Sequence, residues 1–219
     1  DVYKRQVLKA GYALLPTFAD IFNLNNEANS ELIWTLPYIV NENVTPGTSP
    51  NFFAYYLAPN GDRTRLREAG YTEDEVPAGS HAQYVVPTQA YCDFLAEDAR
   101  DTRTDVSVRV FEDKFLTEEV QIKRMVVKFK GSFANDTRSF DSDVPVYRLA
   151  EAYLLKAEVE NALGNTDAAL QNLNVVAKRA YGVDNYYTAR TQDAIDNAII
   201  SEILKELSLI HISEPTRRS

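Results

Sequence analysis

The sequence is poor in cysteine, histidine and tryptophan: its 219 residues include 1 Cys, 2 His and 1 Trp. A single cysteine, Cys92, excludes both an internal disulfide and a zinc site built from several cysteines. Cys92 lies among apolar residues of an expected helix, which favours a small buried side chain over a nucleophile. His81 and His211 are too few for a conventional metal site. We therefore expect neither a metal nor a cofactor.

Motifs that carry chemistry are also absent. The sequence contains no P-loop, GxGxxG, HExxH or G-x-S-x-G pattern. The acidic runs TEDE (72–75) and AEDARDTRTD (96–105) offer the oxygen ligands that calcium takes, but without the glycine spacing of a calcium loop. They are better explained as solvated surface and helix-end charge. Glu151 and Glu158 could in principle act as an acid and a base, but they lie on one expected helix among packing positions. We therefore expect no catalytic residues and no enzyme activity.

Positive charge is scarce as well. Lys and Arg number 23 against 32 Asp and Glu, which gives a net charge of −9. Binding to DNA or RNA needs concentrated positive charge on the protein, so this balance disfavours nucleic acid as a partner. No apolar run approaches the roughly 18 residues that suggest a membrane helix. Composition is otherwise that of an ordinary globular protein, with 45% hydrophobic and 25% charged residues.

The two ends do not follow the patterns of the rest. The apolar stripe of the last helix stops near residue 207, and LSLIHISEPTRRS (207–219) has no periodicity and contains a proline. This tail resembles a translated sequencing-library adaptor, and DVYKRQ (1–6) resembles its companion. We therefore expect residues 1–6 and 207–219 to be artefacts and residues 7–206 to be a fragment of a larger domain.

The segments between the ends predict a mainly α fold with short strands and long irregular loops. A first helix is expected from residue 7, with Leu8, Tyr12, Leu15, Phe18 and Phe22 on one side. Alternating or β-branched runs predict strands at 30–40, 106–110 and 121–133. From Pro145 onward the pattern is helical: helices are expected over 145–163, from 165 or 166 to 180, and over 191–207.

The segment 145–180 predicts a helical hairpin that resembles one tetratricopeptide-like unit. Gly164 is expected to close its first helix in the left-handed conformation, and Asn165 or Thr166 to cap its second. Units of this kind cannot bury their apolar faces alone, so several normally stack. No second copy occurs at a fixed period in the 219 residues. Truncation upstream of residue 7 explains the missing partners best.

A long loop over residues 41–63 holds the best candidates for ligand binding. Flat aromatic rings can cover the apolar C–H faces of a sugar while nearby polar groups read its hydroxyls. Anchoring of the loop to the core is an equal alternative for the FFAYY run. Trp34, in a strand, is expected in the core. The candidate ligand-binding residues are Phe52, Phe53, Tyr55, Tyr56, Asn60, Asp62 and Arg63.

Several stretches, in order, resemble the SusD/RagB family of outer-membrane nutrient-binding lipoproteins. VPTQAYCDFLAEDARDTR resembles its P-[ST]…L…D-x-R segment, with Asp98 and Arg100 in the matching places. KFKGSFANDTRSFDSDVPVYRLAEAYLLKAEVENALGN resembles its most recognisable stretch, a strand, a loop and a motif-bearing helix. AIISEILKEL begins a further motif that the tail interrupts. The positions that match the helix motif are Arg148, Ala150, Glu151, Leu154, Ala157, Glu158 and Gly164.

This resemblance implies a SusD-like fold and a cell-surface lipoprotein of the outer membrane. The intact protein would bind oligosaccharides of a polysaccharide-utilization system and deliver them to a SusC-type TonB-dependent transporter. It would contact the membrane only through an N-terminal lipid that this segment lacks. The motif residues are expected to hold the structure, with Arg148, Glu151 and Glu158 pairing at helical spacing or tying down neighbouring loops. A helical-repeat module that binds a protein and no sugar is the alternative.

Overall fold

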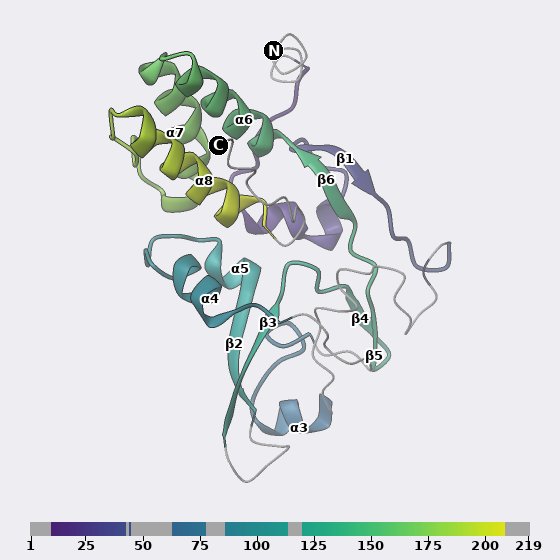
Figure 1. Cartoon of the computed structure of the whole chain (residues 1–219). Helices are drawn as coiled ribbons and strands as arrows, with labels where there is room; N and C mark the ends of the chain where they lie inside the picture. Colours follow the sequence, from purple (N-terminus) through teal and green to yellow (C-terminus); the bar gives the residue numbers. More distant parts are fainter. Residues whose placement is uncertain (1–9, 43, 45–62, 78–85, 114–119, 209–219) are drawn as a thin grey trace.

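The structure, a computed structural model, describes residues 10–42, 44, 63–77, 86–113 and 120–208. The fold is mainly helical with short strands, as the sequence predicts (Figure 1). The α-helices are α3 (Arg63–Glu68), α4 (Gln89–Leu95), α5 (Thr104–Ser107), α6 (Leu149–Ala162), α7 (Thr166–Tyr181) and α8 (Gln192–Glu206). The strands are β1 (Leu32–Leu36), β2 (Val108–Asp113), β3 (Gln121–Val126), β4 (Ser132–Ala134), β5 (Thr137–Ser139) and β6 (Val144–Arg148).

Helices α6, α7 and α8 pack together as one unit at the upper left of Figure 1. Small side chains at the contact, such as the fully buried Ala150 and Ala157, let the helix axes approach closely. Larger apolar side chains from the three helices fill the space between them. The buried core of this unit includes Leu154, Leu170, Leu173, Val176, Ile195, Ile199 and Leu207.

The turn between α6 and α7 follows from the glycine at its centre. Gly164 has φ +78°, a left-handed conformation that glycine adopts without steric cost. The Asn165 N–H donates to the Glu160 carbonyl at 2.8 Å, and the Gly164 N–H donates to the Asn161 carbonyl at 3.0 Å. These bonds satisfy carbonyls that the helix end would otherwise leave free. The predicted role of Gly164 is confirmed.

The helix expected over 145–163 is predicted wrongly at its start. Residues 145–148 form strand β6, and α6 begins only at Leu149. Val144 and Val146 are β-branched, Pro145 cannot donate in a helix, and β1 is available for pairing. β6 pairs antiparallel with β1, in the register that sets Leu32 opposite Arg148 and Leu36 opposite Val144. The long-range ladder therefore decides where the helix begins.

The first expected helix does not form over the residues that the structure describes. Residues 10–18 contain no helix, and only two short 3₁₀ segments follow, η1 (Ala19–Phe22) and η2 (Leu24–Asn26). Gly11 has φ +85°, which a right-handed helix does not allow, and Pro16 removes a donor from the expected helix interior. Phe18 and Ile21 are nevertheless buried, so the apolar pattern identified core residues but not their backbone conformation.

The lower half of the molecule holds two more two-stranded sheets, β2–β3 and β4–β5 (Figure 1). A second core cluster lies here and includes Leu66, Val76, Phe111, Met125 and Val127. Cys92 of α4 is buried against Leu95 and Val108, as the sequence predicts. Of the helices described, none is long and apolar enough to cross a membrane.

Candidate functional site

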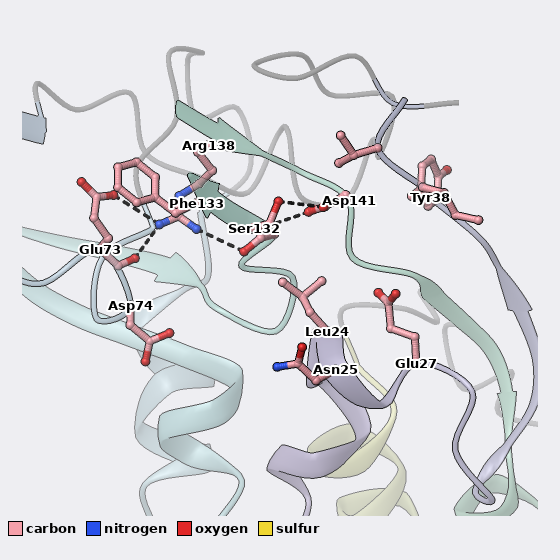
Figure 2. Close-up of a pocket in the computed structure, with 13 residues that line it drawn as sticks. Leu24, Asn25, Glu27, Tyr38, Glu73, Asp74, Ser132, Phe133, Arg138 and Asp141 are labelled. Carbon is pink, nitrogen blue, oxygen red and sulfur yellow. Dashed lines mark hydrogen bonds and ion pairs between the residues drawn. The ribbon is translucent and has the colours of Figure 1, made fainter. Parts of the chain in front are cut away.

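A hollow of about 510 Å³ lies where four segments of the chain meet (Figure 2). The segments are η2, the chain just after β1, the turn before residue 75, and the β4–β5 hairpin with its flanks. Its size lies within the range of small-molecule pockets in proteins. The lining residues are Leu24, Asn25, Glu27, Tyr38, Ile39, Val40, Glu73, Asp74, Gly131, Ser132, Phe133, Arg138 and Asp141.

Arg138, a buried residue of β5, holds one wall together. Its guanidinium donates to the Glu73 carbonyl at 2.7 Å, to a Glu73 carboxylate oxygen at 3.2 Å and to the Lys130 carbonyl at 2.6 Å. The guanidinium carbon also lies 5.3 Å from the centre of the Phe133 ring, a cation–π distance. Arg138 thereby fixes the turn at Glu73 against the β4–β5 hairpin and sets the position of Phe133.

A second wall depends on Asp141 and Gly131. The Asp141 carboxylate accepts from the Ser132 N–H at 2.6 Å and from the Ser132 hydroxyl at 2.7 Å (Figure 2). Gly131 has φ +65°, and a Cβ there would come within 2.0 Å of the Ser139 carbonyl oxygen. Only glycine allows the two chain segments to approach this closely. The sequence therefore builds this side of the hollow around a residue without a side chain.

Two partly buried carboxyl groups, Glu27 of the lining and Asp143, hold one edge of the hollow. Glu27 accepts from the Asp143 N–H at 2.9 Å, and Asp143 accepts from the Tyr38 N–H at 2.9 Å. Burial raises the pKa of Glu27 and of Asp143, although these backbone donors act against the rise. The chain of bonds fixes the backbone of Tyr38 at the edge of the hollow.

The chemistry of the lining suits a polyhydroxylated ligand. Tyr38 and Phe133 contribute aromatic side chains to the lining, while Asn25, Asp74 and Asp141 contribute amide and carboxylate groups that can bond hydroxyls. Asp74 is exposed and pairs with Lys130 at 2.9 Å. Among the described residues, no group of three or more His, Cys, Asp or Glu side chains could hold a metal ion.

Most of the predicted ligand-binding residues lie outside the described part of the chain. This holds for Phe52, Phe53, Tyr55, Tyr56, Asn60 and Asp62. Arg63 begins α3, and its side chain is likewise outside the description. Their role stays a prediction. Sequence reasoning overlooked Tyr38, Phe133, Arg138 and Asp141, although the acidic run at 72–75 and the polar loop after residue 130 were visible signals.

The motif residues of α6 occupy structural positions. Ala150, Leu154 and Ala157 are fully buried in the helical core, whereas Glu158 is exposed. Arg148, just before α6, is 2% exposed and points into a cluster of buried charges. Its ion-pair partners are Glu206 at 2.8 Å and Glu31 at 3.4 Å. Of the two roles open to Arg148, tying distant segments together is thus the one observed.

The buried charge cluster joins five segments of the chain. Arg179 at the end of α7 pairs with Glu31 at 2.6 Å and also with Glu206. Arg103 pairs with Asp101 at 2.8 Å and with Glu202 at 2.7 Å. Negative and positive side chains balance within it. We call this set the charge cluster; its members are Glu31, Asp101, Arg103, Arg148, Arg179, Glu202, Lys205 and Glu206.

Electrostatics of the charge cluster centre on Glu206. Burial alone would raise the pKa of its carboxyl group, but the guanidinium groups of Arg179, Arg148 and Arg103 outweigh burial and hold that pKa well below its usual range. The carboxyl group of Glu206 is thus kept ionised by its partners. Removal of one partner of such a buried pair leaves the other charge uncompensated and destabilises the native packing.

Trp34 is a further correction. It was expected in the core, but its side chain is 53% exposed on β1. It lies beside Tyr147 of β6, with the ring centres 5.9 Å apart and the rings tilted by 31°. β1 and β6 pair antiparallel. An antiparallel sheet can cover the core with one face and expose the side chains of the other face to water.

Comparison with known proteins points to one family. A family model described as "SusD family" matches residues 114–209. SusD-like protein P25 of Formosa agariphila is 28% identical over 92% of this chain and 42% of its own length. These two matches support membership of the SusD/RagB family. The expectation drawn from the motifs is confirmed.

Solved structures show that the fold of this SusD-like chain is shared. A SusD superfamily protein from Bacteroides fragilis matches with a TM-score of 0.69 and 24% identity, over 91% of this chain and 42% of that protein. Surface glycan-binding protein A from Bacteroides uniformis matches with a TM-score of 0.63 and 21% identity, over 93% and 41%. The chain therefore spans less than half the length of these relatives.

Proposed function

We propose that this chain is the ligand-binding part of a surface lipoprotein that captures oligosaccharides and passes them to a SusC-type TonB-dependent transporter. SusD-family proteins are outer-membrane-associated lipoproteins that bind carbohydrate, associate with a transporter and are not enzymes. One observation supports the proposal above the others. The hollow combines two aromatic rings, Tyr38 and Phe133, with carboxylate and amide groups around about 510 Å³ of space.

The physical basis is the two-sided nature of a sugar ring. Its C–H face is apolar and gains by covering an aromatic ring, whereas its hydroxyl edge needs hydrogen-bond partners that replace water. Tyr38 and Phe133 can meet the first need, and Asn25, Asp74 and Asp141 the second. The printed name of one structural neighbour, a surface glycan-binding protein, agrees with this ligand class.

Binding of oligosaccharides by calorimetry tests the proposal. The wild-type chain is expected to bind at least one member of a panel of α-glucan, β-glucan, xylan, chitin and host-type oligosaccharides. Replacement Tyr38→Ala should weaken that binding about tenfold, or about 1.4 kcal/mol, because a stacking face is lost. Tyr12→Ala, at a tyrosine that does not line the hollow, is the matched control and should leave the affinity unchanged.

Charged groups of the hollow allow a second comparison. Asp74→Asn removes an exposed carboxylate of the lining, and Glu158→Gln removes an exposed carboxylate of α6. Only the first should change the affinity for the oligosaccharide. Two outcomes would contradict a binding site in the hollow. In the first, the wild-type chain binds no member of the panel; in the second, Tyr38→Ala and Tyr12→Ala bind the oligosaccharide with equal affinity.

Transfer to a transporter is tested separately with the intact protein. The intact protein is expected to co-purify with a TonB-dependent receptor from outer membranes. The Tyr38→Ala variant should co-purify equally well, because we assign the hollow to sugar binding and not to receptor binding. Failure to recover any such receptor under conditions that preserve other outer-membrane complexes would contradict this part of the proposal.

A further inference from the structure

The lining of the hollow carries more negative than positive side chains. Its carboxyl groups belong to Glu27, Glu73, Asp74 and Asp141, whereas Arg138 is the one basic residue among the lining residues that the structure describes. A cavity lined by one sign of charge favours ligands of the opposite sign. A sugar that enters this space therefore meets a negative charge as well as aromatic and hydrogen-bonding groups.

Two of the four carboxyl groups are neutralised by basic partners. Glu73 pairs with Arg67 at 3.0 Å and with Arg138 at 3.2 Å. Asp74 pairs with Lys130 at 2.9 Å. Opposite charges this close to each other largely cancel at the distance of a ligand. The wall that contains Glu73 and Asp74 therefore adds little net charge to the hollow.

The other two carboxyl groups, those of Glu27 and Asp141, have uncharged partners. Glu27 accepts from the Asp143 N–H, and Asp141 accepts from the N–H and the hydroxyl of Ser132. In the part of the chain that the structure describes, neither of them forms an ion pair with a lysine or an arginine, and nor does Asp143. We call Glu27, Asp141 and Asp143 the acidic edge of the hollow.

The carboxyl groups of the acidic edge act on one another. Burial is the main cause that raises the pKa of Glu27; the Asp143 N–H opposes it, and the negative charges of Asp143 and Asp141 raise the pKa further. Figure 2 shows Glu27, after η2, and Asp141, after β5, on two segments that border the same space. Like charges gathered in this way favour a cation beside them and disfavour an anion.

An ammonium group fits the acidic edge better than a metal ion does. Among the described residues, no group of three or more His, Cys, Asp or Glu side chains could hold a metal ion. A metal ion needs several ligand oxygens in direct contact, whereas an ammonium group is attracted over longer distances and needs only a few acceptors. An amino group on a sugar ring is largely protonated near neutral pH, as α-amino groups are.

We infer that the hollow selects its oligosaccharide by charge: Glu27 and Asp141 favour a sugar that carries an ammonium group and disfavour one that carries a carboxylate. The selectivity rests on the proposed function of the hollow and adds the class of sugar that the hollow takes. Asn25 and Tyr38 supply amide and ring partners that an amino sugar uses and a simple cation does not. Glu27 and Asp141 are specificity-determining residues in this role.

Matched sets of hexasaccharides test the selectivity, because ring and linkage stay constant while the charge changes. One set holds cellulose-type chains of glucose, glucosamine and glucuronate, and the other holds pectin-type chains of galactose, galactosamine and galacturonate. In at least one set, calorimetry should give affinities in the order amino, neutral, uronate, with about tenfold between successive members. The differences should shrink from about 0.02 to about 0.5 M salt, because salt screens charges.

Charge-neutral variants give an independent readout. Glu27→Gln and Asp141→Asn each remove one charge and keep an oxygen that can accept the same backbone N–H. In either variant the ratio of the amino affinity to the uronate affinity should fall about tenfold, whatever the change in each affinity. Glu158→Gln, at an exposed carboxylate of α6, is the matched control and should leave the ratio unchanged. This control is needed because the whole chain has a net charge of −9 and attracts any polycation.

Three outcomes overturn the selectivity while the hollow stands. In the first, a neutral or uronate hexasaccharide binds at least as tightly as its amino counterpart, or the chain binds a member of the wider panel but no amino hexasaccharide. In the second, the ratio falls equally in Glu158→Gln. In the third, trilysine binds as tightly as the amino hexasaccharide, which shows attraction of cations in general.

Absence of binding by both sets and by the wider panel has a different meaning. It overturns the function proposed for the hollow, and the selectivity with it. If an amide variant does not fold, the order of the three affinities and the comparison with trilysine in the wild-type chain still decide the question.

Discussion

Arg148 and Glu206 are 58 residues apart in the chain, yet an Arg148 guanidinium nitrogen lies 2.8 Å from a Glu206 carboxylate oxygen. Both side chains are almost fully buried. A second nitrogen of Arg148 donates to the Glu206 carbonyl at 2.7 Å. This contact locks the start of α6 to the end of α8 and makes Glu206 the centre of the charge cluster.

Loss of the Glu206 charge should therefore be costly. Glu206→Gln leaves Arg148 and Arg179 buried with incomplete compensation, and removal of one partner of a buried ion pair typically costs about 3–5 kcal/mol. Urea unfolding followed by circular dichroism measures the change. Glu158→Gln, at an exposed position of α6, should stay within about 0.5 kcal/mol of wild type. Equal midpoints for both variants would contradict the structural role of the cluster.

Acid should lower the free energy of unfolding through the carboxyl group of Glu206. The folded pKa of Glu206 lies well below its ordinary value of 4.5, since the three guanidinium groups outweigh the effect of burial. Its stabilising contribution is thus fully present above that ordinary value and is lost as the pH falls toward the folded pKa. The free energy of unfolding should fall between about pH 5 and pH 3, and more steeply in wild type than in Glu206→Gln. Parallel pH curves would exclude Glu206 as the source.

Lys128 should make the stability of the fold depend on pH near neutrality, above the acid range in which Glu206 acts. It is 1% exposed, and burial together with the nearby positive charge of Arg148 lowers its pKa to about 7 from 10.5. The unfolded chain then binds more protons than the folded chain above about pH 7, so stability should rise with pH through this range. Unfolding measured from about pH 6.5 to 8.5 should show the rise in wild type and not in Lys128→Met.

The Lys128→Met variant carries its own control. It should be more stable than wild type at the acidic end of that range, where the buried ammonium must stay charged, and the gap should close as the pH rises. The replacement also removes a hydrogen bond to the Ser208 carbonyl at 3.0 Å, which sets the residual difference at high pH. A gap that is constant with pH would mean that Lys128 does not titrate in this range.

Two glycines with similar backbone angles should respond differently to alanine. Gly164 has open space where a Cβ would stand, so Gly164→Ala should cost only the left-handed strain, about 1–2 kcal/mol. At Gly131 the added Cβ would also meet the Ser139 carbonyl oxygen at 2.0 Å. Gly131→Ala should lower the melting temperature further and weaken oligosaccharide binding, whereas Gly164→Ala should leave binding unchanged. Similar losses in both variants would contradict the close packing at Gly131.

Local patterns predicted the helical part of this protein well. The apolar stripe and small residues of 149–181 identified the hairpin, and Gly164 marked its turn, because helix packing and helix ends depend mainly on residues close in sequence. The family motif was readable for the same reason. Failures came where distant contacts compete with local preference. Residues 145–148 became a strand because β1 offered a ladder, and residues 10–18 lost their helix to Gly11 and Pro16.

The candidate site was harder to anticipate. Tyr38, Asp74, Phe133 and Asp141 come from segments up to about a hundred residues apart, and none forms a motif with its sequence neighbours. Asp98 and Asp101 show that even a short local motif does not predict which of its copies is buried. Each begins a D-x-R triplet and accepts from its own arginine, but Asp98–Arg100 lies at the surface, whereas Asp101–Arg103 is buried against Glu202.

By itself the sequence indicated the family, the mainly helical class and the α6–α7 hairpin, because these depend on composition and on short-range spacing. Tertiary structure alone decided the partners of Arg148, the exposure of Trp34 and the walls of the hollow. Those features arise from packing between segments remote in the chain. Which charge meets which, and which ring stays in water, is settled only when the segments come together.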